Sequence, residues 1–488
     1  MTFSLFIQAV HAGLKIKFTY FLVFLSCFRY GEGMNKLILS PFFLCGLFLA
    51  GCSVRSSDSS FETVRSVIEE RIPEKIVWRE GAYEIKNQLL QEIQQEGLTQ
   101  EKAVQLALIN NPDLFAYYEN LELGYADLLE AGLMQNPFFS ASVRFPSQSS
   151  YRLNNLFDAA INFLDLFLIP LRKRAAEAEI KVIEAEVGQR VLDLVKEVQI
   201  HWLELKALEV QLKEEGKRAE LKQMAAALAG LQNKAGNINA LSARSREIEY
   251  EKAVENLKGF EADLESSREK MNRALGLFGK ESFWKITGEI DEDKEPDLPD
   301  LYQMEQAAVE NRLDIEAVRR EVHAIAQRAK LKAWWTYSNL LIGVSSEMQP
   351  EGFTTTGPSI DLQIPIFNHG QGEKKRYHAK LEQAQKRLLS KAVQACSEVR
   401  EFFKTASKYR SQLEDLEMRI LPNLEKQIID GQTHYNVMTL GSYALLDLKE
   451  NEIQATIEHI RALQHYKKAK IELLHAVGGS FALVRKQE

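Results

Sequence analysis

The chain has 488 residues, and its 61 lysines and arginines against 68 aspartates and glutamates give a formal net charge of −7. This length allows two or three ordinary domains or one elongated body, and the lack of a basic excess argues against a nucleic-acid-binding protein. With only four cysteines, the protein has to be stabilised by packing rather than by a disulfide framework.

An apolar run over residues 37–51 follows a short basic start at Met34 and ends at Cys52, where a serine-rich segment begins. A charged start, a short apolar run and small residues before its end are typical of a secretory signal, and the run is too short to span a bilayer comfortably. The order Leu-Ala-Gly-Cys resembles a bacterial lipoprotein cleavage box. We therefore predict a lipoprotein signal peptide at residues 34–51 and a lipidated mature N-terminus at Cys52. The alternatives are an uncleaved anchor and a cleaved signal with an incidental cysteine.

Residues 1–33 contain a second apolar stretch ahead of this complete signal. We expect Met34 to be the true start and residues 1–33 to be a non-native N-terminal extension. Residues 52–97 then form a lipid-anchored N-terminal segment. If Cys52 is acylated, Cys396 has no intramolecular partner, and we expect it to be a small buried apolar residue.

Long helices are predicted for most of the remaining chain. Proline is absent between Pro170 and Pro296, and only Pro422 occurs after Pro365. Both regions are rich in Ala, Leu, Glu, Lys and Gln, which are strong helix formers. Long charged stretches of this kind indicate coiled coils or stacked helical hairpins.

The sequence contains an internal repeat. ALINNPDLFA from Ala107 aligns with AVENRLDIEA from Ala308, an offset of 201 residues, and NRALGL near Gly276 aligns with LHAVGG near Gly478, an offset of 202. Each copy is predicted to hold a helix of about thirty residues, two extended segments and two long helices joined near a glycine. The predicted divisions are a first repeat at 98–290, an acidic linker at 291–300, a second repeat at 301–479 and a C-terminal tail at 480–488.

The extended segments alternate with period two, as strands do when their two faces differ in polarity. The last of them is expected to continue to Ile366. The apolar residues of this pattern are predicted to face lipid and include Phe139, Val143, Ile161, Ile342 and Leu362. The polar residues are predicted to face a lumen and include Ser142, Arg144, Asn162 and Gln363.

Half-buried strands of a soluble sheet also alternate. Strands isolated among long helical stretches make a poor soluble core, however, whereas strands of this length with one apolar face span outer membranes. A membrane sheet must close into a barrel, and bacterial barrels have at least eight strands, so four predicted strands per chain require oligomerisation. Two chains give eight strands around a filled interior, and three give twelve around a water-filled lumen. The polar strand faces favour a trimer.

These features together resemble the TolC-type outer-membrane efflux protein family. The resemblance runs from Leu98 to Gly479 and rests on the twofold repeat, ALINNP at 107–112, GPSIDLQIPIFNHGQG at 357–372 and HYNVMTLGSYALLDLKENEI at 434–453. VWRE, AGNI and YNVM are similar to the lipid-anchored branch often associated with metal-ion efflux. The resemblance implies a mainly α-helical fold with a small membrane β-barrel. Long helical hairpins would form an α-barrel tunnel, and four strands per chain would complete a twelve-stranded trimeric barrel.

Proteins of this family are passive ducts in the bacterial outer membrane that extend into the periplasm. Besides membrane lipid, the resemblance implies three kinds of partner: further copies of the chain in a homotrimer, a periplasmic adaptor protein, and an inner-membrane pump of the resistance-nodulation-division or similar type. Metal cations are the suggested substrates, with drugs or general solutes as the alternative. The competing class is a lipid-anchored periplasmic coiled-coil structural protein that forms no channel.

The resemblance also places hairpin turns near an adaptor contact at Gly236 and Gly441, and a periplasmic gate at Asp447 and Glu450. Asp447 and Glu450 are three residues apart on one helix face, so threefold symmetry would stack two rings of carboxylates, which favour cations. The alternative is that both carboxylates pair with Lys449 and its neighbours on a solvated surface.

Sequence motifs give no support for catalysis or metal binding. The sequence after the signal has no pair of histidines at the i, i+4 spacing of a zinc site and no Cys-x-x-Cys. We therefore predict that the protein is not an enzyme and has no catalytic residues, metal site or cofactor.

Overall fold

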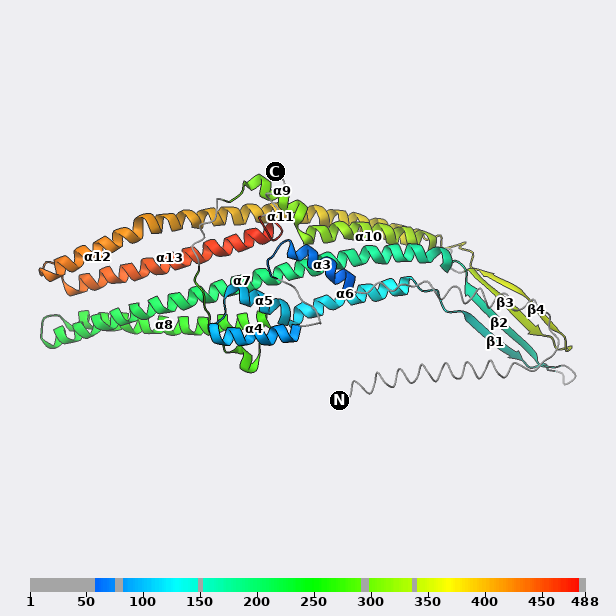
Figure 1. Cartoon of the computed structure of the whole chain (residues 1–488), viewed down its shortest axis with the longest axis horizontal. Coiled ribbons are helices and arrows are strands. Elements are labelled where there is room, and N and C mark those ends of the chain that lie inside the picture. Colours follow the sequence, from blue (N-terminus) through cyan, green and yellow to red (C-terminus); the bar gives the residue numbers. More distant parts are fainter. Residues whose placement is uncertain (1–57, 75–81, 148–151, 291–297, 336–339, 482–488) are drawn as a thin grey trace. The chain divides into compact units, whose positions relative to one another are not determined.

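The computed structural model describes residues 58–74, 82–147, 152–290, 298–335 and 340–481, all within one compact unit formed by residues 56–488 (Figure 1). The predicted signal peptide, Cys52 and most of the predicted linker lie outside the described residues. Within them the predicted fold class is confirmed, because long helices dominate and the strands form one small antiparallel sheet.

The two halves of the described chain contain corresponding elements in the same order. The first half comprises α5 (Gln100–Asn110), α6 (Pro112–Ala131), β1 (Phe138–Arg144), β2 (Asn154–Asn162), α7 (Asp165–Lys234) and α8 (Ala240–Leu275). The second half comprises α9 (Leu301–Asn311), α10 (Leu313–Trp335), β3 (Leu340–Met348), β4 (Thr354–Leu362), α11 (Gln371–Asp415), the π-helical turn η2 (Leu416–Ile420), α12 (Leu421–Asn436) and α13 (Ser442–Ala476). Outside this pattern are α3 (Asp58–Glu69), α4 (Ala82–Glu96) and the short 3-10 helix η1 (Gly279–Ser282).

The helix predicted to open each copy is two helices rather than one of about thirty residues. α5 ends because Asn111 is extended, with φ −70° and ψ 117°, and Pro112 then opens α6. Proline disfavours the helical conformation of the residue before it, and Asn111 Oδ1 accepts a hydrogen bond from Leu114 N at 2.9 Å as an N-cap. In the second copy the same break falls at Arg312, which has ψ 129°.

In each copy, the glycine after the last long helix packs against the end of the first helix of the same copy. Gly276 after α8 has φ +67°, and a Cβ there would lie 2.6 Å from Asn110 O. Gly478 after α13 has φ +103°, and a Cβ there would lie 3.1 Å from Asn311 O. Both positions need glycine, because it adopts positive φ readily and lets the backbones approach. The two asparagines are 201 residues apart and the two glycines 202, which are the offsets of the sequence repeat.

The long stretch of the first copy is continuous, whereas that of the second is interrupted. α7 runs for 70 residues, which corresponds to about 105 Å. In the second copy the turn at Leu416–Ile420 is π-helical and ends two residues before Pro422. Proline has no N–H to donate and its ring crowds the preceding turn, so a widened turn at this point has a local cause.

The main hydrophobic core lies where α3 to α8 meet, and it includes Leu98, Val104, Val191, Trp202 and Met271. The Phe61 ring of α3 meets the Tyr118 ring of α6 edge-on at 5.4 Å between centroids. Trp202 Nε1 donates to Leu98 O at 3.0 Å. Burying a large side chain contributes about 1.5–3 kcal/mol, so this cluster holds the helix pairs of the first copy together.

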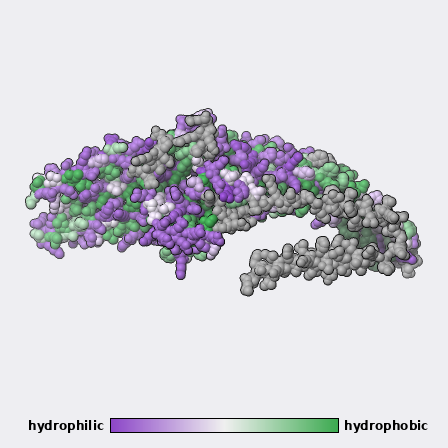
Figure 2. All heavy atoms as spheres, viewed as in Figure 1, coloured by the Kyte–Doolittle hydropathy of each residue, from purple (hydrophilic) through white to green (hydrophobic). Residues whose placement is uncertain are grey.

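A smaller core lies in the second copy and contains Met304, Ala395, Val399 and Leu473. Cys396 was expected to be buried, but it is only half-buried. It follows Ala395 in α11 and is therefore turned about 100° away from the face that meets this core. Away from the cores the helices are polar, and hydrophilic residues cover much of the helical surface in view in Figure 2.

Candidate functional site

The strands of both copies form one antiparallel sheet in the order β1-β2-β3-β4. The central pair joins the copies, since β2 pairs with β3 and Ile161 lies opposite Ile342. β1 and β4 are the edges, and each pairs with one other strand of the described chain. The sheet is therefore built by both repeats and has two open edges in the protomer.

One face of this sheet is mostly apolar, with polar exceptions that include Asn155, Ser346 and Thr356. Residues directly opposite each other in antiparallel strands point to the same side, so the register assigns the faces. All five residues predicted to face lipid lie on the face that contains Phe139, Ala141, Val143, Phe157, Ala159, Ile161, Leu340, Ile342, Val344, Ile360 and Leu362. Phe139 is 68% exposed and Ile360 is 70% exposed in the protomer. A contiguous exposed apolar face of this kind indicates an interaction surface.

The opposite face of the sheet is mostly polar. It contains Ser140, Ser142, Arg144, Asp158, Asn162, Ser345, Glu347, Ser359 and Asp361. Asn162 is buried rather than open, because its Nδ2 donates to Gln135 Oε1 at 3.3 Å and its Oδ1 accepts from Leu164 N at 3.2 Å. The predicted lumen residues therefore share this side within the strands, with Asn162 held at the end of the sheet.

The end of β4 differs from the prediction. β4 starts at Thr354 and ends at Leu362 instead of continuing to Ile366, so Gln363 lies just outside the strand. Pro365 has no N–H to donate to a neighbouring strand, which favours a strand end before it. The expectation that Gln363 belongs to the strand pattern was wrong.

Asp165 fixes the junction between the sheet and α7, and the sequence analysis missed it. Its side chain is 2% exposed, and its Oδ2 accepts a hydrogen bond from Gln135 N at 2.7 Å. Its Oδ1 pairs with Arg172 at 2.7 Å. A single carboxylate thus ties the segment before β1 to the start of α7. The signal in the sequence that could have identified it is an acidic residue in the first turn of a long helix.

The two hairpin tips differ in chemistry. In the first, Gly236 between α7 and α8 has φ +75°. In the second, the left-handed residue is Met438, with φ 61°, while Gly441 has φ −79° and is the N-cap of α13. Met438 lies 202 residues after Gly236, and Gly441 lies 202 residues after Asn239, the N-cap of α8. Gly236 and Gly441 therefore both lie at hairpin tips, but they are not equivalent positions of the two copies.

Met438 is 94% exposed and sits in a conformation unfavourable for residues with a Cβ. We expect Met438→Gly to stabilise the tip by about 0.5–1 kcal/mol, because the penalty removed exceeds the chain entropy that glycine loses. Hydrogen exchange of the backbone amides around the tip should become slower. Val437→Gly is the control, since Val437 has φ −92° and should gain nothing. Equal effects of the two substitutions would contradict strain at Met438.

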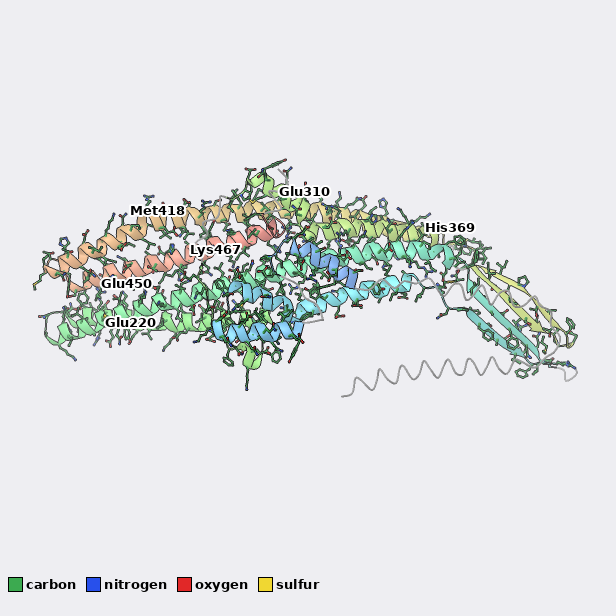
Figure 3. The ribbon with its side chains drawn as sticks, viewed as in Figure 1. Glu220, Glu310, His369, Met418, Glu450 and Lys467 are labelled. Atoms are coloured by element: carbon green, nitrogen blue, oxygen red, sulfur yellow. The ribbon has the colours of Figure 1, made fainter. Side chains whose placement is uncertain are left out.

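A ladder of polar contacts joins α13 to the first hairpin. From the tip inward, Tyr443 Oη donates to Gln232 Oε1 at 3.0 Å, and Glu450, which is labelled in Figure 3, pairs with Lys222 at 2.6 Å. Further pairs are Asp447 with Arg246, Gln454 with Arg218, Arg461 with Gln211 and Lys468 with Glu204. The α13 residues are spaced by three, four or seven positions, which places them along one helix face. We call these six pairs the polar ladder.

The candidate gate residues belong to this ladder. Lys222 contacts both Glu450 and Glu249, and Arg246 lies 3.8 Å from Asp447 and stacks over the Tyr443 ring at 5.0 Å. The carboxylates raise the pKa of Lys222, although burial opposes this. Lys449, the alternative partner weighed from the sequence, instead pairs with Glu452 at 3.0 Å. In the protomer Asp447 and Glu450 thus face cations of the other hairpin.

Glu204 is the carboxylate in the inner part of the ladder. Its pKa is lowered to about 2 by His201 and Lys468, while burial opposes the shift. Lys468 Nζ, at 2.8 Å, is the firmer partner, because His201 Nδ1 is 3.8 Å away, beyond hydrogen-bonding distance. The folded pKa lies below that of an unfolded glutamate. The ionised form therefore contributes stability above the unfolded value, and this contribution is lost as the pH falls toward 2.

We expect Glu204→Gln to lower the melting temperature at neutral pH and to reduce its dependence on pH between about 4.5 and 2. Melting curves followed by circular dichroism across this range measure both effects. Glu209→Gln is the control, because Glu209 is more exposed and its ion pair among the described residues is with Lys206 of its own helix. If Glu204→Gln and Glu209→Gln shift the acid branch equally, Glu204 holds no special place in the ladder.

No protein-family model and no curated protein matches the sequence, whereas several solved structures match the fold. The CmeC outer membrane channel of Campylobacter jejuni has a TM-score of 0.65 at 13% identity, covering 83% of this chain and 89% of that chain. CusC, whose crystal structures concern folding and transmembrane channel formation, has a TM-score of 0.62 at 15% identity. The match covers 78% of this chain and 92% of CusC. VceC, an outer membrane protein of Vibrio cholerae, has a TM-score of 0.60 at 16% identity, covering 78% and 96%.

The chain has the fold of TolC-type outer-membrane channels. At these identities the likeness concerns the fold, and the roles of individual residues have to be argued from this chain. Among the described residues, no helix is both long and apolar enough to cross a membrane. No three His, Cys, Asp or Glu side chains in the described ranges are grouped so that they could hold a metal ion.

Proposed function

We propose that the protein is a passive outer-membrane channel that acts as a homotrimer in an efflux system. The observation that carries this proposal is the sheet with one apolar face, one polar face and two open edges. Pairing β1 of one copy with β4 of the next leaves no open edge once three copies have joined into a closed barrel. The apolar face then meets lipid, and the polar face lines a water-filled lumen.

Conductance tests this proposal. The purified protein should have the mass of a trimer in detergent and give stepwise currents in planar lipid bilayers. A folded trimer that gives no current would instead support the lipid-anchored coiled-coil protein without a channel. The division into repeats at 98–290 and 301–479 belongs to the same proposal, since each repeat supplies two strands and one hairpin.

We infer that the polar ladder closes the periplasmic entrance, with Asp447 and Glu450 as gate residues. The ladder holds α13 against the first hairpin through charges that are partly screened from water, such as Lys222, which is 17% exposed. Breaking it would free the second hairpin to move outward. The tips around Gly236, Met438 and Gly441 are the surfaces proposed to meet a periplasmic adaptor, and through it an inner-membrane pump.

Metal cations are the proposed substrates, on the strength of the sequence resemblance to the metal-associated branch. Drugs or general solutes are the alternative, because a duct of this kind need not select what the pump delivers. Deleting the gene and measuring growth with a panel of metal salts, dyes and detergents discriminates between the two. Sensitivity to dyes and detergents alone would remove the metal proposal.

We propose further that Cys52 carries lipid and starts the mature protein. α3 begins six residues later, at Asp58, and its Phe61 contacts Tyr118 of α6. Six extended residues span at most about 20 Å, so a lipid on Cys52 would be attached within that distance of the start of α3. Mass spectrometry of the mature N-terminus should show an acylated Cys52. An unmodified Cys52 or another mature start would exclude it. Cys52→Ala should still insert, because the barrel supplies far more apolar area than the lipid.

A further inference from the structure

Several helix ends meet at one edge of the sheet. β2 runs into α7, α10 leads into β3, and β4 is followed by α11. The register sets Asn162 opposite Leu341 and Leu340 opposite Leu362, so these three connections lie at the same end of the strands. Side chains in the first turns of α7 and α11 and in the last turns of α10 are therefore close to the sheet.

This region is strongly basic in a chain whose formal net charge is −7. Across residues 328–335 and 371–380, Glu373 is the single acidic residue. The basic residues of these two segments, which we call the basic collar, are Arg328, Lys330, Lys332, Lys374, Lys375, Arg376 and Lys380. A cluster of one sign next to a membrane-spanning sheet produces a local potential that attracts opposite charge.

Most of this charge is not neutralised within the protomer. Arg328 pairs with Glu179, and Arg376 pairs with Glu373. Lys330, Lys374, Lys375 and Lys380 are exposed, and none of them has a carboxylate within ion-pair distance among the described residues. Lys380 Nζ lies 5.3 Å over the ring of Tyr377, which holds that ammonium group near the helix surface. The ammonium groups of Lys330, Lys374, Lys375 and Lys380 are thus available to bind an anion.

A groove of about 180 Å³ runs between α10 and α11 within the collar. Its lining is largely apolar, with Ile325, Ala329, Ala333, Tyr377 and Leu381 along the walls. Lys332 and Lys374 come from opposite helices and line the same groove. Glu373 and His378 of α11 line the groove as well, and Glu373 pairs with Arg376. The groove therefore combines apolar walls with two lysines, one on each side, and one carboxylate that has its own partner.

We propose that the basic collar and its groove bind the headgroup of an anionic phospholipid in the leaflet next to the helices. The proposal rests on the proposed function, because it requires the sheet to span a membrane. Lys332 and Lys374 bind the phosphate, and the apolar walls contact the glycerol and upper acyl carbons. Phosphatidylglycerol satisfies both the charge and the apolar surface, whereas zwitterionic phosphatidylcholine carries no net charge for the collar to attract.

Fluorescence quenching by brominated lipid tests this preference. Trp334 and Trp335 are the last two residues of α10 and belong to the collar segment 328–335, and a Trp334→Phe/Trp335→Phe trimer separates their signal from that of the other tryptophans. Wild-type trimer in vesicles should bind brominated phosphatidylglycerol at least fivefold more strongly than brominated phosphatidylcholine, since one engaged lysine is worth about fivefold. Lys332→Gln/Lys374→Gln should bring the ratio close to one, and 0.5 M salt should weaken it.

Two controls keep the outcome clear. Lys213→Gln/Lys252→Gln removes the same charge from exposed positions of α7 and α8 remote from the sheet and should keep the preference. Lys374→Gln alone should lower the ratio if the double variant does not assemble. Equal quenching by both lipids in a conducting trimer would overturn the lipid site. So would a changed ion selectivity of Lys332→Gln/Lys374→Gln with an unchanged lipid ratio, because the lysines would then line the pore. Absence of both quenching and conductance would reject the channel function itself.

Discussion

Lys222→Glu is expected to give trimers that conduct far more current than the wild type in planar bilayers. Lys222 Nζ lies 2.6 Å from Glu450 and 3.3 Å from Glu249, so the substitution replaces two ion pairs with three neighbouring carboxylates. The site is partly buried, so the cost is between that of a surface pair and a buried pair, about 2 kcal/mol. A change of that size shifts the equilibrium between closed and open entrances about thirtyfold.

A charge on the same helix provides the matched control. Lys217 pairs with Glu214 at 2.6 Å within α7 and is 51% exposed, so Lys217→Glu should leave conductance unchanged. Adding Glu450→Lys to Lys222→Glu places opposite charges side by side again and should lower the current. If Lys217→Glu and Lys222→Glu conduct equally, the polar ladder does not hold the entrance closed.

Asp447→Ala/Glu450→Ala separates two models of the gate. If the carboxylates formed free rings around the axis, removing them would raise conductance and abolish cation preference. If they serve mainly to bind Arg246 and Lys222, removing them raises conductance and leaves these two cations with Glu249 as the carboxylate partner that they share, so cation preference falls further and can reverse. Reversal potentials in a salt gradient measure the difference. Unchanged conductance and selectivity would make Asp447 and Glu450 ordinary surface charges.

Local sequence patterns predicted the parts of the fold that depend on local chemistry. Period two marked all four strands, and the repeat offset related the ends of the copies at Gly276 and Gly478. The breaks at Asn111 and Arg312 were missed, although an asparagine before a proline is a recognised helix boundary. The same offset, applied to the tips, would have pointed to Met438 rather than Gly441.

Local sequence patterns could not predict contacts between segments that are far apart in the sequence. Lys222 and Glu450 are far apart in the sequence, and each sits in a helix whose charges normally face solvent. The heptad-like spacing of Tyr443, Glu450 and Gln454 was visible in the sequence, but their partners on α7 were not. A polar residue in the contact between two coiled-coil helices cannot be distinguished from a surface residue until the position of the opposing helix is known.

Gly343 shows the same limit within the sheet. By register Gly343 lies on the polar face, where the alternating pattern predicts that a large side chain is tolerated. The structure overturns this, because a Cβ at Gly343 would lie 2.2 Å from Ala159 O and 2.7 Å from Ala160 Cβ. The alternating pattern assigns a residue to a face of the sheet but does not show how much space its side chain has. Gly343→Arg is therefore unsuitable as a polar-face control for Ile342→Arg.

Ile342→Arg is expected to impair trimer assembly strongly. Ile342 lies between Ile161 and Ile360 in the register, in the middle of the apolar face. An arginine on the lipid face near the bilayer midplane costs about 2–4 kcal/mol per site, and three copies are affected in a trimer. The fraction of trimer recovered in the outer membrane and its resistance to urea measure the effect.

Ser345→Arg in the same strand is the matched control. Ser345 lies on the polar face between Asp158 and Gly357, and a Cβ at Gly357 would meet nothing within 4 Å, so an arginine has space there and a carboxylate nearby. This variant should assemble and change conductance instead. Gly343→Arg should fail on either face assignment because of the clash with β2, and it therefore reports on packing rather than on lipid. If Ile342→Arg and Ser345→Arg assemble equally well, the apolar face of the sheet does not meet a membrane, and the channel proposal loses the observation that carries it.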